Sequence, residues 1–130
     1  MAAETVPLRV LVVDDNRDAA DTLGTMLQLF GHTTAVAYNS TDGLRLAAET
    51  NPHLAILDIG LPDLDGYELA RRLRQSSPAT MLVALTGYGS PADRRRAHEA
   101  GFHEHFVKPI VLNDLQSVLA RVSAPPPTPG

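Results

Sequence analysis

The stretch Leu54–Glu68 reads LAILDIGLPDLDGYE, and it contains a strand pattern and a helix pattern joined by a short loop. The apolar run LAIL predicts a buried strand over 54–57 that ends in Asp58. Pro62 and Gly66 bracket the loop, and apolar residues at helical spacing predict a helix over 67–74. This stretch therefore predicts a strand–loop–helix unit with a carboxylate at the carboxyl end of the strand.

The same unit recurs on both sides of this stretch. Apolar runs rich in β-branched residues predict further strands over 9–13, 33–37, 81–85 and 102–107. Helical spacing predicts helices over 17–30, from a cap at Ser40 or Thr41 to about 50, over 91–100 and over 112–122. Five strands that alternate with five helices predict right-handed crossovers, and hence an α/β fold with a parallel sheet covered on both faces.

The composition is that of a globular protein with one domain. The chain has 130 residues, of which 44% are hydrophobic and 20% are charged, enough to bury one core. It has no cysteine, which excludes disulfides, thiolate metal sites and cysteine nucleophiles. The net charge of −4 argues against direct nucleic-acid binding. Because there is no apolar run of about 20 residues and no signal-peptide pattern, we expect a cytoplasmic protein without membrane insertion.

The expected domain boundaries follow from the first and last predicted elements. Residues 8–122 are expected to form the domain, preceded by an N-terminal extension over 1–7. The segment 123–130 ends in APPPTPG, cannot continue a helix and is expected to be a proline-rich flexible tail.

Polar residues stand at the carboxyl ends of four predicted strands. They are Asp14 and Asp15 after the first strand, Asp58 after the third, Thr86 after the fourth and Lys108 after the fifth. In an open parallel sheet these ends meet at one edge, where ligands bind. Any one of these residues could simply begin a polar loop, but three acids, a hydroxyl and a lysine at one edge predict a functional site.

This set of side chains suits phosphoryl transfer to a carboxylate. Three crowded carboxylates disfavour each other's ionisation, and Mg²⁺ relieves that repulsion while it keeps sites for water and a phosphate oxygen. Phosphoryl transfer depends on positioning and on stabilisation of charge, which a metal, an ammonium and a hydroxyl can supply. A carboxylate can itself be the nucleophile and form an aspartyl phosphate. Asp58 is therefore the predicted phosphoryl acceptor.

Four motifs, taken together in this order, resemble a known family. They are VLVVDDN (Val10–Asn16), LAILDIGLPDLDGYE (Leu54–Glu68), ALTGYG (Ala84–Gly89) and FVKP (Phe106–Pro109). Over about 8–122 the chain resembles the receiver domain of bacterial two-component response regulators, including those like the chemotaxis regulator. The resemblance implies a doubly wound, flavodoxin-like fold with strand order 2-1-3-4-5.

The resemblance also implies a role for the strand-end residues in signalling. Asp58 would take a phosphoryl group from a phosphohistidine on a histidine kinase or phosphotransfer protein. Thr86 and Lys108 would contact the transferred group, and the Lys108–Pro109 peptide would be cis.

Mg²⁺ is the cofactor that the resemblance implies. Asp15 and Asp58 would be direct ligands, and Asp14 would hold a metal-bound water. Gly60 would complete the site with its backbone carbonyl, so its lack of a side chain is no obstacle.

The implied output is a change on the fourth helix, the fifth strand and the fifth helix that a downstream protein recognises. The chain would be a monomer or a weak dimer through that surface. It would not be an enzyme with an external substrate, since it would catalyse only its own phosphorylation and slow dephosphorylation.

One position departs from the family pattern. The residue three before the lysine is often Tyr or Phe, a ring that moves on activation, and here it is His105. His105 is expected to be either such a moving or partner-facing ring or a passive exposed residue. Strand alternation puts Phe106 on the opposite face, in the core. Together with His98 and His103, His105 is expected on the surface rather than in a metal site.

Other expectations concern the loops around the acceptor. Gly60 and Tyr88 correspond to positions that tune how quickly water removes the phosphoryl group. Asp63 and Asp65 are expected to shape the loop after the third strand and to cap the third helix, and Asn113 to cap the last helix.

Three alternatives remain. A phosphatase of the haloacid dehalogenase type also uses an aspartyl nucleophile, but its pattern Asp-x-Asp is not met by Asp58-Ile59-Gly60. An inert interaction domain would not need the complete set of strand-end residues. The chain could also be a free-standing receiver or a receiver derived from a hybrid kinase.

Overall fold

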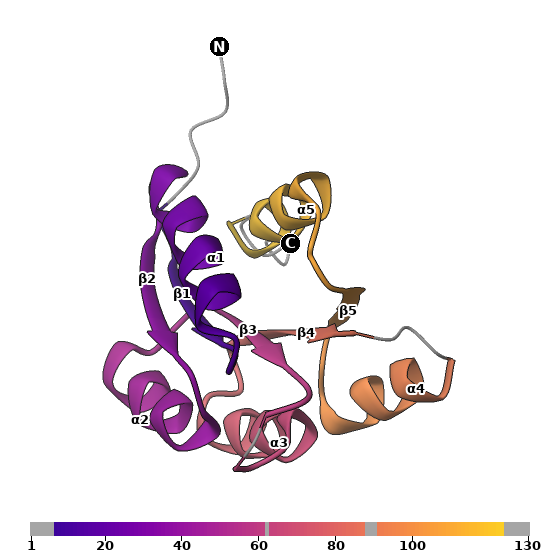
Figure 1. Cartoon of the computed structure of the whole chain (residues 1–130). Helices are drawn as coiled ribbons and strands as arrows, with labels where there is room; N and C mark the ends of the chain where they lie inside the picture. The colour runs from indigo at the N-terminus through magenta and orange to yellow at the C-terminus, as the bar shows by residue number, and fades with distance from the viewer. Residues whose placement is uncertain (1–6, 62, 88–90, 124–130) are drawn as a thin grey trace, which may run out of the picture.

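The computed structural model describes residues 7–61, 63–87 and 91–123, and these form five strands that alternate with five helices. The strands are β1 (Arg9–Val13), β2 (Thr33–Ala37), β3 (Leu54–Asp58), β4 (Met81–Thr86) and β5 (Glu104–Val107). The helices are α1 (Arg17–Leu29), α2 (Ser40–Thr50), α3 (Gly66–Ser76), α4 (Pro91–Ala100) and α5 (Leu112–Ser123). All neighbouring strands run parallel in the order β2-β1-β3-β4-β5, which confirms the predicted fold (Figure 1).

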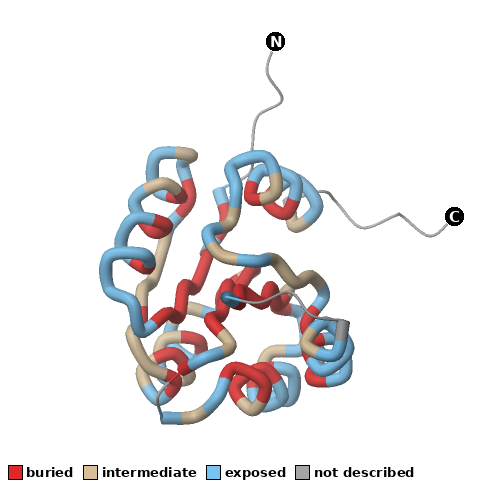
Figure 2. The backbone as a smooth tube through the Cα atoms, turned by 45° about the vertical axis from the view of Figure 1, so that its right-hand side comes forward, coloured by how far each residue is buried: buried red, intermediate tan, exposed pale blue. Residues whose placement is uncertain are grey.

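The sheet is covered by two helices on one face and three on the other. In Figure 1, α1 and α5 lie above the sheet, and α2, α3 and α4 lie below it. Alternate residues of β1 point to opposite faces, so that Val10 and Val12 pack with α1 and α5, while Leu11 and Val13 pack with the other three helices. The buried residues therefore form two cores that sandwich the sheet, and Figure 2 shows them concentrated along the strands.

The start of α2 differs from the prediction of a cap at Ser40 or Thr41. Asn39 is the N-cap, and its side-chain oxygen accepts a hydrogen bond from the Asp42 N–H at 2.8 Å. Ser40 is the first helical residue and is fully buried, and its hydroxyl donates to the Leu64 carbonyl instead. The helix is therefore capped one residue earlier than predicted.

The start of α5 also differs from the expectation. The helix begins at Leu112, and the Val111 carbonyl already accepts the N–H of Leu115 at 3.0 Å. Asn113 lies in the first turn, so its predicted role as the cap is wrong.

The strand β5 begins at Glu104, two residues after the predicted start. The N–H of Phe102 donates to the Ala97 carbonyl at 3.0 Å, so Phe102 still closes the end of α4 rather than joining the sheet. Gly101 provides the left-handed turn at this point with a φ of 110°.

Two further findings concern the chain as a whole. Among the described residues, no helix combines the length and the apolar character needed to span a membrane. Residues 1–6 and 124–130, which make up most of the predicted N-terminal extension and tail, lie outside the described residues.

Candidate functional site

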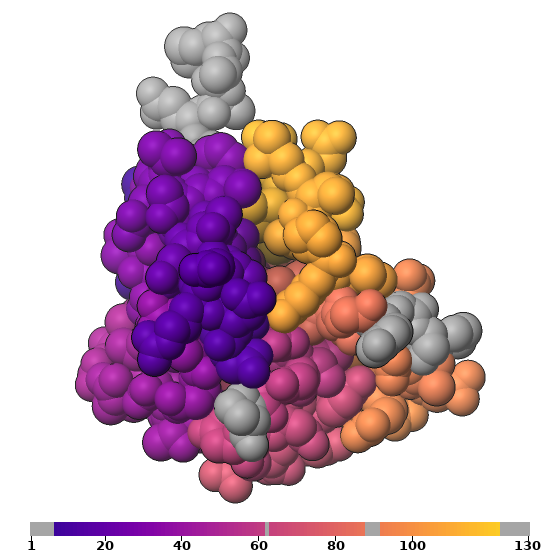
Figure 3. Space-filling model, in the orientation of Figure 1, coloured from indigo at the N-terminus to yellow at the C-terminus, as the bar shows by residue number. Residues whose placement is uncertain are grey.

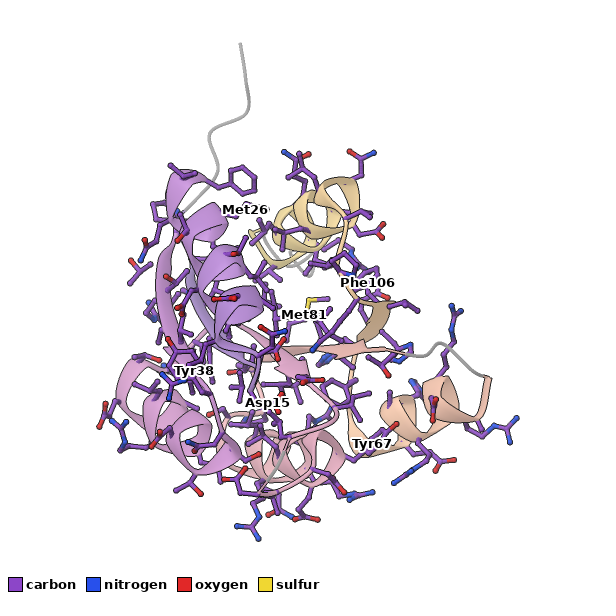
Figure 4. All side chains as sticks on the ribbon, viewed as in Figure 1. Asp15, Met26, Tyr38, Tyr67, Met81 and Phe106 are labelled. Carbon is purple, nitrogen blue, oxygen red and sulfur yellow. The ribbon has the colours of Figure 1, made fainter. Side chains whose placement is uncertain are left out.

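The fold brings the predicted strand-end residues to the same edge of the sheet. Asp14 and Asp15 directly follow β1, and Asp58 is the last residue of β3 (Asp15 is labelled in Figure 4). Thr86 is the last residue of β4 and is buried, and Lys108 directly follows β5. Parallel pairing of β1, β3, β4 and β5 is what collects them, because all four carboxyl ends face the same way.

The ammonium group of Lys108 lies between two buried carboxylates. Its Nζ is 3.0 Å from Asp14 Oδ2 and 3.1 Å from Asp58 Oδ2. The remaining oxygens accept backbone hydrogen bonds, Asp14 Oδ1 from the Asn16 N–H at 3.0 Å and Asp58 Oδ1 from the Gly60 N–H at 3.1 Å. Each oxygen of the two carboxylates therefore has a partner, which offsets their burial: only 3% of Asp14 and 7% of Asp58 are exposed.

Burial and charge act against each other in this cluster. Burial raises the pKa of Asp14 above its ordinary value, and the Asn16 N–H and Lys108 offset this only in part. Burial alone would lower the pKa of Lys108, but hydrogen bonds and charge from Asp14 and Asp58 outweigh it and raise that pKa. Lys108 is thus held as an ammonium in contact with the acids.

The three acids could hold a divalent cation. Asp14, Asp15 and Asp58 each offer one carboxylate oxygen, and these oxygens lie within 4.8 Å of one another. An all-oxygen set of two buried acids and one exposed acid fits Mg²⁺, which takes one or two carboxylates and keeps several waters. Gly60 lies two residues after Asp58 and is exposed.

Backbone hydrogen bonds tie the ends of the strands together around Asp58. The N–H of Ile59 donates to the Leu85 carbonyl at 3.0 Å, and the N–H of Lys108 donates to the Thr86 carbonyl at 2.7 Å. The Lys108–Pro109 peptide is cis, as predicted. Thr86 directly follows Leu85, which pairs with Asp58 across the sheet.

A groove opens beside the acids between α1 and the segment that leads into α5. It has a volume of about 510 Å³, and its apolar lining includes Leu23, Met26 and Ile110, with Asp14 and Lys108 at the polar end. Figure 4 shows Met26 on the side of α1 that faces α5. In Figure 3, α1 (indigo) and the segment leading into α5 (orange to yellow) lie side by side on the viewed face.

His105 and Phe106 lie on opposite faces of β5, as strand alternation predicted. Phe106 is half-buried and packs against the core formed with α1 and α5. His105 faces the other way, beside Arg94 and His98 of α4. His105 is half-buried, so the alternative of a passive exposed residue is wrong; both ring nitrogens are buried, and neither has a hydrogen-bond partner among the described residues.

In the described part of the chain, Asp14, Asp15 and Asp58 form the one group of three or more potential metal ligands that lie close together, and no histidine belongs to it. His98 and His103 are exposed, and the Nδ1 of His103 accepts the Leu82 N–H at 3.0 Å. Tyr88, which was expected to tune the lifetime of the phosphoryl group, lies outside the described residues.

The loop after β3 is built differently from the expectation. Asp65 caps α3, with its carboxylate accepting the Glu68 N–H at 2.9 Å, as predicted. Asp63 does not cap α3, because its carboxylate accepts hydrogen bonds from the first residues of α2. The sequence could not reveal this link, since Asp63 and Ser40 are 23 positions apart.

The chain resembles a family of known proteins over most of its length. The model of the response regulator receiver domain family matches residues 10–120. Response regulator MprA of Mycobacterium sp. (strain KMS) is 34% identical over 119 residues, which cover 92% of this chain and 50% of that protein. The chain thus spans about half the length of this curated relative.

Solved structures show the same fold. Chemotaxis protein CheY4 of Vibrio cholerae matches with a TM-score of 0.83 and 26% identity, covering 90% of this chain and 99% of that chain. A chain from the co-crystal structure of the Saccharomyces cerevisiae histidine phosphotransfer signalling protein Ypd1 and the receiver domain of its downstream response regulator Ssk1 matches with a TM-score of 0.84. That match has 26% identity and covers 90% of this chain and 89% of the other.

Proposed function

We propose that this chain, which belongs to the response regulator receiver domain family, accepts a phosphoryl group on Asp58 in a Mg²⁺-dependent reaction. Membership of the family makes it a receiver domain of two-component signalling. The observation that carries the proposal is the contact of one ammonium with two buried carboxylates, in which Lys108 Nζ lies 3.1 Å from Asp58 Oδ2 and 3.0 Å from Asp14 Oδ2.

The proposed reaction forms an acyl phosphate. A carboxylate oxygen of Asp58 attacks the phosphorus of a phosphohistidine, the P–N bond breaks, and the imidazole leaves with the electron pair of that bond. Lys108 is placed to pair with a phosphoryl oxygen, because its ammonium already contacts the acceptor carboxylate. Thr86, at the end of the neighbouring strand, would donate its hydroxyl to the transferred group.

Asp14, Asp15 and Asp58 are the side chains that would hold Mg²⁺, and the backbone carbonyl of Gly60 would complete the site. The ion would supply positive charge that offsets repulsion between the carboxylates and the incoming phosphoryl group. The chain's own contribution is a set of oxygens that the β-strands and the Lys108 contact hold in place before the reaction.

The groove beside the acids offers an approach for the phosphoryl donor. Its apolar wall includes Leu23 and Met26 of α1 and reaches Asp14 and Lys108, so a protein bound there could bring a phosphohistidine to Asp58. The structural match to a chain of the Ypd1–Ssk1 co-crystal supports a histidine phosphotransfer protein or a histidine kinase as the donor.

The proposed output surface consists of α4, β5 and α5. Val107, Val111 and Leu112 are exposed apolar residues at the end of β5 and the start of α5, with exposed fractions of 44%, 56% and 48%. Such a patch suits recognition by a downstream protein or weak self-association. His105 is half-buried on the α4 side, and its ring nitrogens have no hydrogen-bond partner among the described residues. This ring is the group that we expect to move when Asp58 is phosphorylated.

The proposed activity is confined to the chain's own acceptor. It would catalyse its own phosphorylation and slow dephosphorylation, with no external substrate turned over. A phosphatase of the haloacid dehalogenase type is not supported, because the family match covers residues 10–120 and Asp58 is followed by Ile59 and Gly60 rather than by a second acid.

The test is incubation with a small phosphodonor and Mg²⁺, followed by intact mass measurement and peptide mapping. The expected product is one acid-stable, hydroxylamine-sensitive phosphoryl group on Asp58. It should be absent in Asp58→Asn and strongly reduced in Asp15→Asn or in EDTA. Asp42→Asn, which alters an acid in the first turn of α2, serves as the control and should react normally. An unmodified chain, or an adduct on a histidine, would refute the mechanism.

A further inference from the structure

Asp63 joins the loop after β3 to the start of α2. Its Oδ1 accepts the Ser40 N–H at 2.9 Å, and its Oδ2 accepts the Thr41 N–H at 3.1 Å and the Thr41 hydroxyl at 3.0 Å. The Ser40 hydroxyl donates in return to the carbonyl of Leu64, the next residue of the loop. Two consecutive loop residues are thus bound to two consecutive helix residues.

The charge of Asp63 suits this place. The first N–H groups of a helix lack partners within the helix and carry the positive end of its dipole, which favours a carboxylate. The hydrogen bonds from Ser40 and Thr41 accordingly hold the pKa of Asp63 well below its ordinary value, so the group stays charged across the physiological range.

The base of the same loop is also closed. The N–H of Gly66 donates to the Ile59 carbonyl at 2.9 Å. A Cβ on Gly66 would lie 2.6 Å from both the Asp58 carbonyl oxygen and the Ile59 Cα, so the start of α3 presses directly against the end of β3. Ile59 is therefore bound to the start of α3 beside β3, and Asp63 and Leu64 are bound to the start of α2.

Gly60 connects this loop to the acceptor carboxylate. Its N–H donates to Asp58 Oδ1 at 3.1 Å, on the oxygen that Lys108 does not contact. We infer that Asp63 is a positioning residue, which anchors the chain after β3 to α2 so that the Gly60 amide fixes the orientation of the Asp58 carboxylate for Mg²⁺. This inference rests on the proposed function, because it assigns Asp63 to the same metal and acceptor site.

The test compares Mg²⁺ affinity in the full chain, followed by NMR through the amide shifts of Asp58 and Gly60. Asp63→Ala should raise the Mg²⁺ dissociation constant about 10-fold, as expected for a residue that orients a ligand without touching the ion. It should also shift the Gly60 amide signal before any metal is added. Thr41→Val removes one of the hydrogen bonds, and we expect a smaller change in the same direction.

Asp42→Ala is the matched control. Asp42 lies in the first turn of the same helix, and its carboxylate accepts from the Asn39 side chain at 3.1 Å rather than from the loop. This variant should lower thermal stability as Asp63→Ala does, but leave Mg²⁺ affinity and the Gly60 signal unchanged. Equal Mg²⁺ affinity in all folded variants would overturn the inference and leave Asp63 as a helix cap only.

Two further outcomes separate this inference from the proposed function. If the original chain and Asp15→Asn bind Mg²⁺ equally weakly, the metal site itself is wrong and the role of Asp63 fails with it. If the original chain binds Mg²⁺ through Asp15 but Asp63→Ala and Thr41→Val do so equally well, only the role of Asp63 fails. If Asp63→Ala does not fold, the test is made with Thr41→Val alone.

Discussion

At the scale of single residues, the acceptor site carries an electrostatic cost that the Lys108 contact does not cancel. Asp14 is only 3% exposed, and burial raises its pKa. The folded chain therefore holds a proton at Asp14 more tightly than the unfolded chain does. Consequently the free energy of unfolding falls as the pH rises above the ordinary carboxyl pKa. At neutral pH the protein bears the full cost of burying the ionised Asp14 carboxylate. Function, rather than stability, explains an acid at this position.

Asp14→Asn is accordingly expected to stabilise the metal-free protein. Asn keeps the oxygen that accepts the Asn16 N–H and removes the buried charge. The expected gain is about 1 kcal/mol, or a rise of about 4 °C in Tm, measured by thermal unfolding in EDTA. Added Mg²⁺ should narrow the difference, because only the original chain gains full binding energy. Asp18→Asn, at the exposed start of α1, is the control and should be slightly destabilising. A lower Tm for Asp14→Asn would mean that its pairing with Lys108 outweighs its burial.

At the scale of elements, three histidines stand at the opposite edge of the sheet, each directly before a strand. His32 precedes β2, His53 precedes β3 and His103 precedes β5. The Nδ1 of each accepts a backbone N–H at 3.0 Å, from Leu8, Arg9 and Leu82 respectively. These bonds continue the strand pairing one step beyond the regular sheet, and each needs a neutral ring because a protonated Nδ1 cannot accept.

These three contacts make the fold sensitive to acid. Burial lowers the pKa of all three rings. Arg9 adds to this at His53 and Arg74 at His103, where Glu104 acts in the opposite direction. Because each folded pKa is depressed, the unfolded chain takes up protons first. The stability that the bonds provide is therefore complete above about pH 6.5 and is lost as the pH falls through the lower folded values.

We expect urea unfolding to show a drop of about 1 kcal/mol per histidine between about pH 7.5 and about pH 5. Replacing His32, His53 and His103 by Asn keeps an oxygen near the position of Nδ1 and removes the titration. The triple variant should lose most of the drop, whereas His98→Asn, which changes an exposed histidine of α4, should keep it. An unchanged drop in the triple variant would place the acid sensitivity elsewhere.

At the scale of the whole molecule, the sequence predicted the features that depend on the order of strands and helices along the chain. Alternating strand and helix patterns led to a parallel sheet with Asp58, Thr86 and Lys108 at one edge, and the resemblance to the receiver family supplied the strand order. Contacts between distant segments could not be predicted in this way. The link of Asp63 to Ser40 depends on how closely the loop after β3 approaches α2, which no local pattern encodes. The burial of the His105 ring nitrogens likewise depends on how α4 packs over β5.

The two cores also predict which residues the folded unit requires. Leu8, which is 3% exposed, is the first residue along the chain in the core formed with α1 and α5. Leu119 and Val122 of α5 are the last residues that pack in or against that core. A chain reduced to residues 7–123 should therefore unfold in one cooperative transition, with a free energy within about 0.5 kcal/mol of the original, measured in urea. It should also accept phosphate on Asp58 as before. The matched truncation after Val118 removes Leu119 from the core and should cost at least about 2 kcal/mol. If the first truncation were as costly as the second, the predicted boundaries at 8 and 122 would be wrong, because the terminal segments would then be part of the folded unit.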